Sequence, residues 1–84
     1  MPSAKVNMLY FAQARDLAGT EREDIVLTNP ASTRTIVLRA AKSHPGLLTL
    51  ERVIRVAVNH QVLDGTVVLE DGDEVALLPP VMGG

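Results

Sequence analysis

The stretch STRTIVLRAAKSHPG, residues 32–46, decides the fold, because it is a long segment whose apolar side chains recur at helical spacing. Ser32 or Thr33 can cap its start, since either hydroxyl can accept a hydrogen bond from a free backbone N–H. The apolar positions are Ile36, Val37, Ala40 and Ala41. The sequence His44-Pro45-Gly46 ends the helix, because proline cannot continue it and glycine supplies the turn. We therefore expect one main helix.

Segments with strand-like patterns lie on both sides of this helix, at residues 4–11, 24–28, 53–59, 67–69 and 75–78. A short polar helical stretch, residues 12–18, separates the first two, and Gly19 closes it. The last segment is a continuous apolar run, which suits a strand buried on both faces. Strands on both sides of one long helix predict a mixed sheet with the helix packed across it.

This order of elements predicts an α+β domain of the β-grasp, or ubiquitin-like, class. A ferredoxin-like fold is the competitor, but it needs a second full helix between Asn59 and Val75, and the turn signal Asp64-Gly65 interrupts that span. A length of 84 residues makes one domain. We therefore expect a single β-grasp domain over residues 1–84, in which residues 79–84 form a flexible, functional C-terminal tail.

The composition excludes several classes of function. The chain has no cysteine and two histidines, His44 and His60, so we expect no metal site, no thiol chemistry and no bound cofactor. The net charge is −2 and the cations are not clustered, which argues against nucleic acid. No apolar run approaches the roughly 20 residues that cross a bilayer, and the N-terminus does not resemble a signal peptide. We expect a cytoplasmic protein without a membrane partner.

The most informative segment follows the last predicted strand and reads Pro79-Pro80-Val81-Met82-Gly83-Gly84. Two adjacent prolines leave the sheet and favour an extended conformation, in which the segment reaches roughly 15–18 Å. The two glycines have no side chains, so their backbone fits a passage too narrow for other residues. A terminal Gly-Gly arises by chance in roughly 0.5% of chains. We therefore expect Gly84 to present its carboxylate to a partner.

Four segments resemble the small subunits of molybdopterin synthase. They are DGDEVALLPPVMGG at 71–84, LYFA at 9–12, HPGL at 44–47 and VAVN at 56–59. The order of these segments matches the family, and the terminal one is highly specific. One departure is Met82, since this position before the glycines is usually occupied by a small residue in that family.

The resemblance implies a sulfur carrier. An ATP-dependent activating enzyme would adenylate Gly84 and mediate its conversion to a thiocarboxylate. The loaded tail would then enter the large catalytic subunit of molybdopterin synthase, in a heterotetramer, and give sulfur to a cyclic pyranopterin precursor. Gly83 would provide clearance and Pro79, Pro80, Val81 and Met82 would set reach and direction. The acid–base groups would belong to the partner, so this chain would be a carrier subunit, not itself a catalyst.

Two positions are candidates for the partner interface. Tyr10 and Phe11 adjoin on a strand and so point to opposite faces, which leaves open which of them is exposed. We expect Phe11 and Leu77 to contact the large subunit. An exposed apolar patch should surround the tail's exit, where the apolar residues are Leu77, Leu78, Val81 and Met82. Three other functions remain open. They are a sulfur carrier for thiamine, cysteine or transfer-RNA thiolation, a ubiquitin-like modifier joined to lysines, and an interaction domain with an inert tail.

Overall fold

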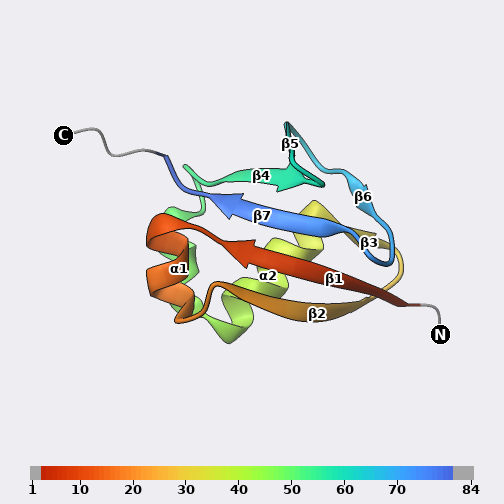
Figure 1. Ribbon diagram of the computed structural model, residues 1–84, viewed down its shortest axis with the longest axis horizontal. Coiled ribbons are helices and arrows are strands. Elements are labelled where there is room, and N and C mark those ends of the chain that lie inside the picture. Colours follow the sequence, from red (N-terminus) through yellow and green to blue (C-terminus); the bar gives the residue numbers. More distant parts are fainter. Residues whose placement is uncertain (1–2, 81–84) are drawn as a thin grey trace.

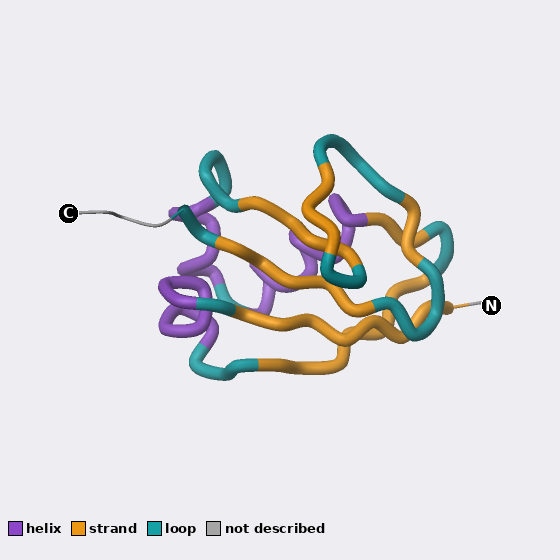
Figure 2. The backbone as a smooth tube through the Cα atoms, turned by 45° about the horizontal axis from the view of Figure 1, so that its top comes forward, coloured by secondary structure: helices purple, strands orange, loops and turns teal. Residues whose placement is uncertain are grey.

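A computed structural model describes residues 3–80 and shows a mixed five-stranded sheet with helices packed on one of its faces (Figures 1 and 2). Chain order is β1 Ser3–Tyr10, α1 Ala12–Ala18, β2 Arg22–Thr28, β3 Ala31–Ser32, α2 Thr33–Ser43, the 3₁₀-helix η1 Pro45–Leu50, β4 Arg55–Val58, β5 Gln61–Leu63, β6 Val68–Leu69 and β7 Glu74–Leu78. The sheet order is β2-β1-β7-β4-β5, and a separate two-stranded sheet joins β3 to β6. The predicted mixed sheet with one main helix across it is confirmed.

Strand β1 forms the centre of the fold, between β2 and β7. It runs antiparallel to β2 and parallel to β7, and its buried side chains are Ala4, Val6, Met8 and Tyr10. This period of two places one face of the strand in the core beneath α2. Helix α1 follows with the predicted bounds, and Gly19 closes it in the left-handed region at φ 75°.

Helix α2 starts at a capping box formed by two hydroxyl residues. The Thr35 backbone N–H donates to the Ser32 side-chain oxygen (3.2 Å), and the Ser32 N–H donates to the Thr35 hydroxyl (2.8 Å). Ser32 is therefore the cap of the two predicted candidates. Thr35 occupies the place that a glutamate or glutamine takes in other capping boxes, so the helix starts without an acidic residue. Burial of Ile36 and Ala40 against the sheet outweighs the modest helix propensity of the β-branched residues.

The segment between α2 and β4 differs from the prediction. Pro45 does not simply end helical structure but begins η1, because proline suits the first turn of a helix. The chain then turns, with the Val53 and Ile54 N–H groups donating to the Leu50 carbonyl (3.0 and 2.9 Å). Strand β4 consequently begins at Arg55 instead of residue 53. The short strands β3 and β5 were not predicted, and β5 and β6 occupy the span where a ferredoxin-like fold needs its second helix.

The prediction that residues 75–78 are buried on both faces is wrong. Val75 and Leu77 are 0% and 1% exposed, whereas Ala76 and Leu78 are only half-buried. The reason is that α2 covers one face of the sheet and leaves the other face open, which is the face toward the viewer in Figure 1. Apolar residues on that open face need a different explanation from core packing.

Candidate functional site: the root of the tail and the open face of the sheet

The C-terminal tail leaves the sheet from a firmly held strand. Strand β7 lies between β1 and β4, so both of its edges are paired. Its last residue, Leu78, lies opposite Arg55 of β4. Pro79 is half-buried and Pro80 is exposed, and neither belongs to a strand, as expected for residues that cannot donate to a ladder. Val81, Met82, Gly83 and Gly84, which were predicted to complete the tail, lie outside the described residues.

A shallow apolar hollow of about 210 Å³ lies on the open face beside the root of the tail. We call it the open-face hollow. Its lining residues are Leu9, Phe11, Ala57, His60, Val62, Glu74, Ala76 and Leu78. Phe11 and Val62 are 47% and 46% exposed. Because Leu78 lines the hollow and directly precedes Pro79, a partner that covers the hollow also meets the start of the tail.

The structure shows which of the two adjacent aromatic residues is exposed. Tyr10 is 2% exposed and points into the core, whereas Phe11 points out at the end of β1 and lines the open-face hollow. The position expected of Phe11 agrees with this geometry, although its contact with a partner stays a prediction. The expectation for Leu77 is wrong, because its side chain lies in the core opposite Tyr10. Its neighbour Leu78 takes the outward place.

Sequence reasoning missed several residues of the hollow. Leu9, Val62 and Ala76 line it, and none was proposed as a site residue. The available signal was weak. The first and last strands carry more apolar residues than a single core-facing side of a strand can hold. A uniform apolar run such as residues 75–78 does not reveal which members face the core.

The acidic turn before β7 has a structural role. The Asp71 carboxylate accepts a hydrogen bond from the Lys5 backbone N–H (2.7 Å), and the Asp73 carboxylate accepts from the Glu70 N–H (2.8 Å) and the Asn59 side chain (3.0 Å). Gly72 lies in the left-handed region at φ 89°, which favours glycine. These carboxylates fix the entry of β7 into the sheet.

A polar cluster lies near the same end of the sheet as the tail. The Tyr10 hydroxyl donates to Glu23 Oε1 (2.5 Å), and His44 Nε2 lies 2.9 Å from the same oxygen. The Tyr10 and His44 rings meet edge to face, with centroids 5.8 Å apart. Burial raises the pKa of the Tyr10 hydroxyl well above its ordinary value, and the hydrogen bond to Glu23 and the charge of that carboxylate raise it further. Tyr10 is therefore a neutral donor.

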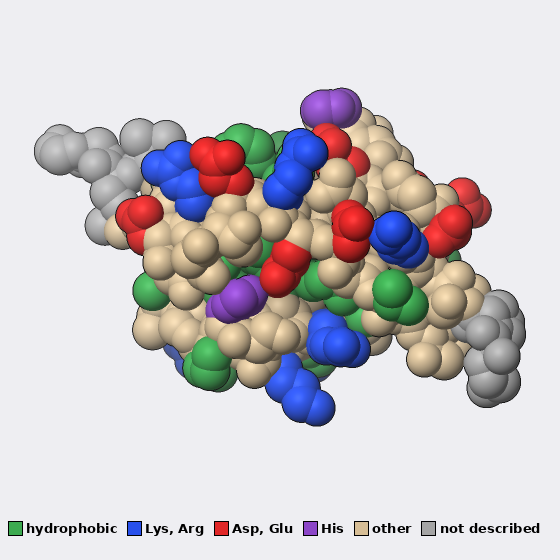
Figure 3. Space-filling model, turned by 60° about the horizontal axis from the view of Figure 1, so that its bottom comes forward, with side chains coloured by type: hydrophobic (Ala, Val, Ile, Leu, Met, Phe, Trp, Pro, Cys, Tyr) green, Lys and Arg blue, Asp and Glu red, His purple; other side chains and the backbone are tan. Residues whose placement is uncertain are grey.

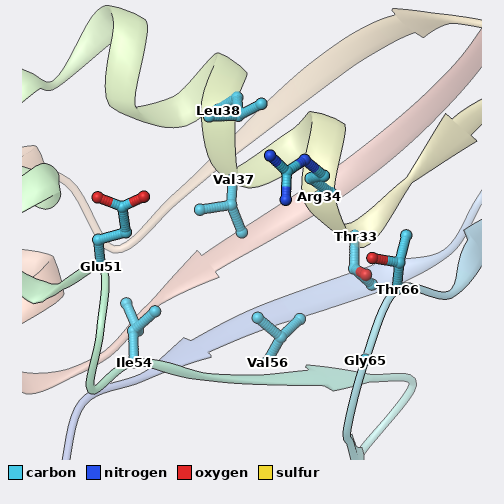
Figure 4. Close-up of a pocket in the computed structure, with 9 residues that line it drawn as sticks. All are labelled: Thr33, Arg34, Val37, Leu38, Glu51, Ile54, Val56, Gly65 and Thr66. Atoms are coloured by element: carbon cyan, nitrogen blue, oxygen red, sulfur yellow. The ribbon is translucent and has the colours of Figure 1, made fainter.

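A second hollow, of about 290 Å³, lies beside α2 on the covered side of the sheet (Figure 4). Figure 4 shows Val37 pointing from the helix toward Ile54 and Val56, with Arg34 and Glu51 at its margin. This arrangement offers no pair of groups suited to acid–base or nucleophilic catalysis.

Within residues 3–80, no group of three or more histidine, aspartate or glutamate side chains is placed to hold a metal ion. In the same range, no helix has the length and apolar character needed to cross a membrane. Figure 3 shows cationic and anionic side chains interspersed over one face, without a large patch of one sign. The root of the tail and the open-face hollow are therefore the best candidates for a functional site among the described residues.

Comparison with known proteins agrees with this geometry. The chain is 38% identical over 80 residues to the molybdopterin synthase sulfur carrier subunit of Escherichia coli, covering 94% of this chain and 99% of the relative. The structure is similar to that of a putative molybdopterin converting factor subunit 1 from Pyrococcus furiosus (TM-score 0.83, 31% identity, 93% and 99% of the chains covered).

Two further solved structures bear on partners and alternatives. One is a complex of subunits 1 and 2 of the molybdopterin-converting factor from Helicobacter pylori (TM-score 0.67, 28% identity, 95% and 99% covered). The other is the small archaeal modifier protein 1 from Methanosarcina acetivorans (TM-score 0.82, 25% identity, 100% of both chains covered). The ThiS family model matches residues 8–84. The chain therefore belongs to the ThiS family, and its fold is the ubiquitin-like β-grasp.

Proposed function

We propose that this chain is the sulfur carrier subunit of a molybdopterin synthase and carries sulfur as a thiocarboxylate on Gly84. The observation that carries the proposal is the placement of the tail. A strand paired on both edges leads directly into Pro79-Pro80. In the sequence, two further residues separate these prolines from Gly83-Gly84. Relatives of nearly equal length that bear the name of sulfur carrier subunit support the same assignment.

The proposed chemistry begins with activation of the carboxylate. A carboxylate is a poor electrophile, because it is anionic and lacks a leaving group. Attack of the Gly84 carboxylate on the α-phosphorus of ATP, catalysed by the activating enzyme, forms an acyl adenylate and releases pyrophosphate. A sulfur nucleophile delivered by a donor then displaces AMP. The thiocarboxylate that results is a stronger nucleophile than the parent acid and can give sulfur to a cyclic pyranopterin precursor.

Each residue of the tail has a separate role in this proposal. Gly84 carries the sulfur, and Gly83 allows a narrow passage in the partner because it has no side chain. Pro79, Pro80, Val81 and Met82 set the reach and direction, and the prolines reduce the entropy lost when the tail is ordered in the partner. This assigns no catalytic acid or base to the chain. The proposal places it in the cytoplasm, where ATP is supplied.

The proposed partner is the large catalytic subunit, in a heterotetramer with one carrier at each end. The open-face hollow supports this, because an apolar surface with an exposed aromatic residue, Phe11, is typical of a protein interface. A partner that covers the hollow contacts Leu78, which directly precedes the tail. The related complex of subunits 1 and 2 from Helicobacter pylori provides a precedent for such an assembly.

Intact-mass spectrometry tests the carrier chemistry directly. The chain is incubated with its cognate activating enzyme, ATP and a sulfur source, and we expect one oxygen of the protein to be replaced by sulfur at Gly84. A control without ATP should remain unmodified. If the cognate enzyme, verified as active, leaves this chain unmodified, the proposed function is wrong.

Two alternatives share the same tail. A carrier for thiamine, cysteine or transfer-RNA thiolation would be loaded in the same way, but would fail to co-purify with the large subunit of molybdopterin synthase. A protein modifier would form amide bonds to lysines of other proteins, and the similarity to a small archaeal modifier protein favours keeping this possibility in the test. A ladder of conjugates on a blot of cell extract would identify it.

A further inference from the structure

The cluster of Tyr10, Glu23 and His44 joins two of the sequence segments that resemble the family but have no role in the tail chemistry. Tyr10 belongs to the LYFA segment and His44 to the HPGL segment, 34 positions further along the chain. Glu23 lies between them on β2 and accepts from Tyr10 while contacting His44 through the same oxygen. Three elements, β1, β2 and the end of α2, therefore meet at one carboxylate.

The position of this cluster relates it to the tail. Tyr10 is the last residue of β1 and lies opposite Leu77 in the parallel pairing with β7. Parallel strands leave a sheet at the same end, so β1 ends where the tail begins. The ring of Tyr10 is buried in the core, and its backbone N–H donates to the Glu21 carbonyl (2.8 Å). Tyr10 is thus fixed by both its main chain and its side chain.

The residues after Tyr10 depend on how it is held. Phe11 has an extended backbone (φ −119°, ψ 151°), and its carbonyl accepts from the Ala14 N–H (3.0 Å), which starts α1. Ala12 follows at φ 49°, an uncommon conformation for a residue with a side chain. With Tyr10 turned into the core, the alternation of the chain turns Phe11 outward into the open-face hollow beside Leu78.

We infer that Glu23 is a positioning residue for partner binding, which acts by holding Tyr10 and His44 together so that Phe11 and the root of the tail keep the geometry the large subunit recognises. The carboxylate suits this role because one of its oxygens accepts a hydrogen bond from the Tyr10 hydroxyl and also lies 2.9 Å from His44 Nε2. Glu23 itself lies on the covered side of the sheet, with 31% of its side chain exposed, and does not line the open-face hollow. The inference rests on the proposed function, because it assumes the large subunit as partner.

The test compares variants of the full chain in binding to the purified large subunit, measured by calorimetry at a temperature where every variant is folded. We expect Glu23→Ala to weaken the affinity about fivefold to tenfold, the size typical of residues that act through a shared contact. Glu23→Gln should recover most of the loss, since its amide oxygen still accepts a hydrogen bond from Tyr10. Tyr10→Phe removes only the hydroxyl and provides a second, milder variant.

Leu69→Val is the matched control, because Leu69 is 3% exposed and lies in β6, outside the five-stranded sheet that holds the tail. It should lower stability without changing affinity more than about twofold, as expected of an independent site. In the Glu23→Ala chain the amide resonances of Phe11 and Leu78 should shift, and in the control they should not.

The outcomes separate the two claims. If wild-type chain binds the large subunit and Glu23→Ala binds equally well, the positioning role is wrong and the proposed function stands. Equal losses of affinity in Glu23→Ala and in the Leu69→Val control also overturn the positioning role, because general destabilisation then explains both. If the wild-type chain itself does not bind, the proposed partner is wrong.

Discussion

Leu77 and Leu78 form a natural matched pair, because they are adjacent, identical and on opposite faces of β7. Leu77 is 1% exposed in the core, and Leu78 is half-buried in the open-face hollow. We predict that Leu77→Ala mainly lowers stability and that Leu78→Ala mainly lowers the affinity for the large subunit. The same atoms are deleted in both variants. Any difference between their effects therefore reflects which face of the sheet the side chain occupies.

The expected sizes follow from burial. Truncating a fully buried leucine to alanine costs about 2–5 kcal/mol, including the cavity that remains. The unfolding free energy of a chain of this length is about 4–13 kcal/mol, so Leu77→Ala removes a large share of it. At about 4–8 °C per kcal/mol, the Tm falls by roughly 10 °C or more. Leu78→Ala should cost the isolated chain about 1 kcal/mol or less, because most of its surface loss occurs only in the complex.

Urea titration at 25 °C measures the first quantity and calorimetric titration of the large subunit measures the second. Loss of a side chain from a central interface pocket costs about 1–3 kcal/mol, which corresponds to an affinity roughly fivefold to 150-fold lower for Leu78→Ala. Folded Leu77→Ala should bind within about threefold of wild type. The reasoning is refuted if Leu78→Ala destabilises the free chain as much as Leu77→Ala does, or if it binds the large subunit with unchanged affinity.

Three further predictions concern the cap, a pH effect and the tail. Ser32→Ala removes the acceptor of the capping box and should cost about 1 kcal/mol in urea unfolding, while Arg34→Ala, at the second residue of the same helix, should cost less. Tyr10 has a raised pKa in the folded chain, so its stabilising effect is complete below about pH 10 and is lost as the pH rises further. Tyr10→Phe should therefore flatten the alkaline fall in Tm, and an unchanged fall would contradict this. A residue added after Gly84 should abolish sulfur loading in the mass assay, whereas a tag before Met1 should leave it intact.

The sequence predicted best those elements whose side chains repeat with a clear period. Residues 12–18 and the helix beginning near Ser32 were recognised because apolar spacing, hydroxyl caps and a closing glycine agree with one another. Strands β3 and β5 were missed, since two or three residues are too few to establish any period. Helix η1 was missed because Pro45 was interpreted as a stop, although proline is also compatible with a first helical turn.

The site was predicted less completely than the fold for one physical reason. The run Val75-Ala76-Leu77-Leu78 is apolar throughout, so the sequence does not show which alternate residues face the core. The phase is set by pairing with β1, where Tyr10 lies opposite Leu77, and this register depends on contacts between segments more than sixty residues apart. The sequence left open which of Tyr10 and Phe11 is exposed, and of the two leucines expected beside the tail only Leu78 faces the open side.

The pairing of β1 with β7 places the side chains that stabilise the core and those proposed for partner binding on opposite faces of the same two strands. On the covered face Tyr10 and Leu77 lie side by side in the core, and the residues that follow them, Phe11 and Leu78, lie on the open face beside the tail. A shift of β7 by one residue against β1 would turn Leu77 out of the core and Leu78 into it. The partner recognition proposed for Phe11 and Leu78 therefore requires the same register that stabilises the fold. This is the physical reason to expect that a buried cluster which holds the end of β1, with Glu23 at its centre, affects binding without touching the partner.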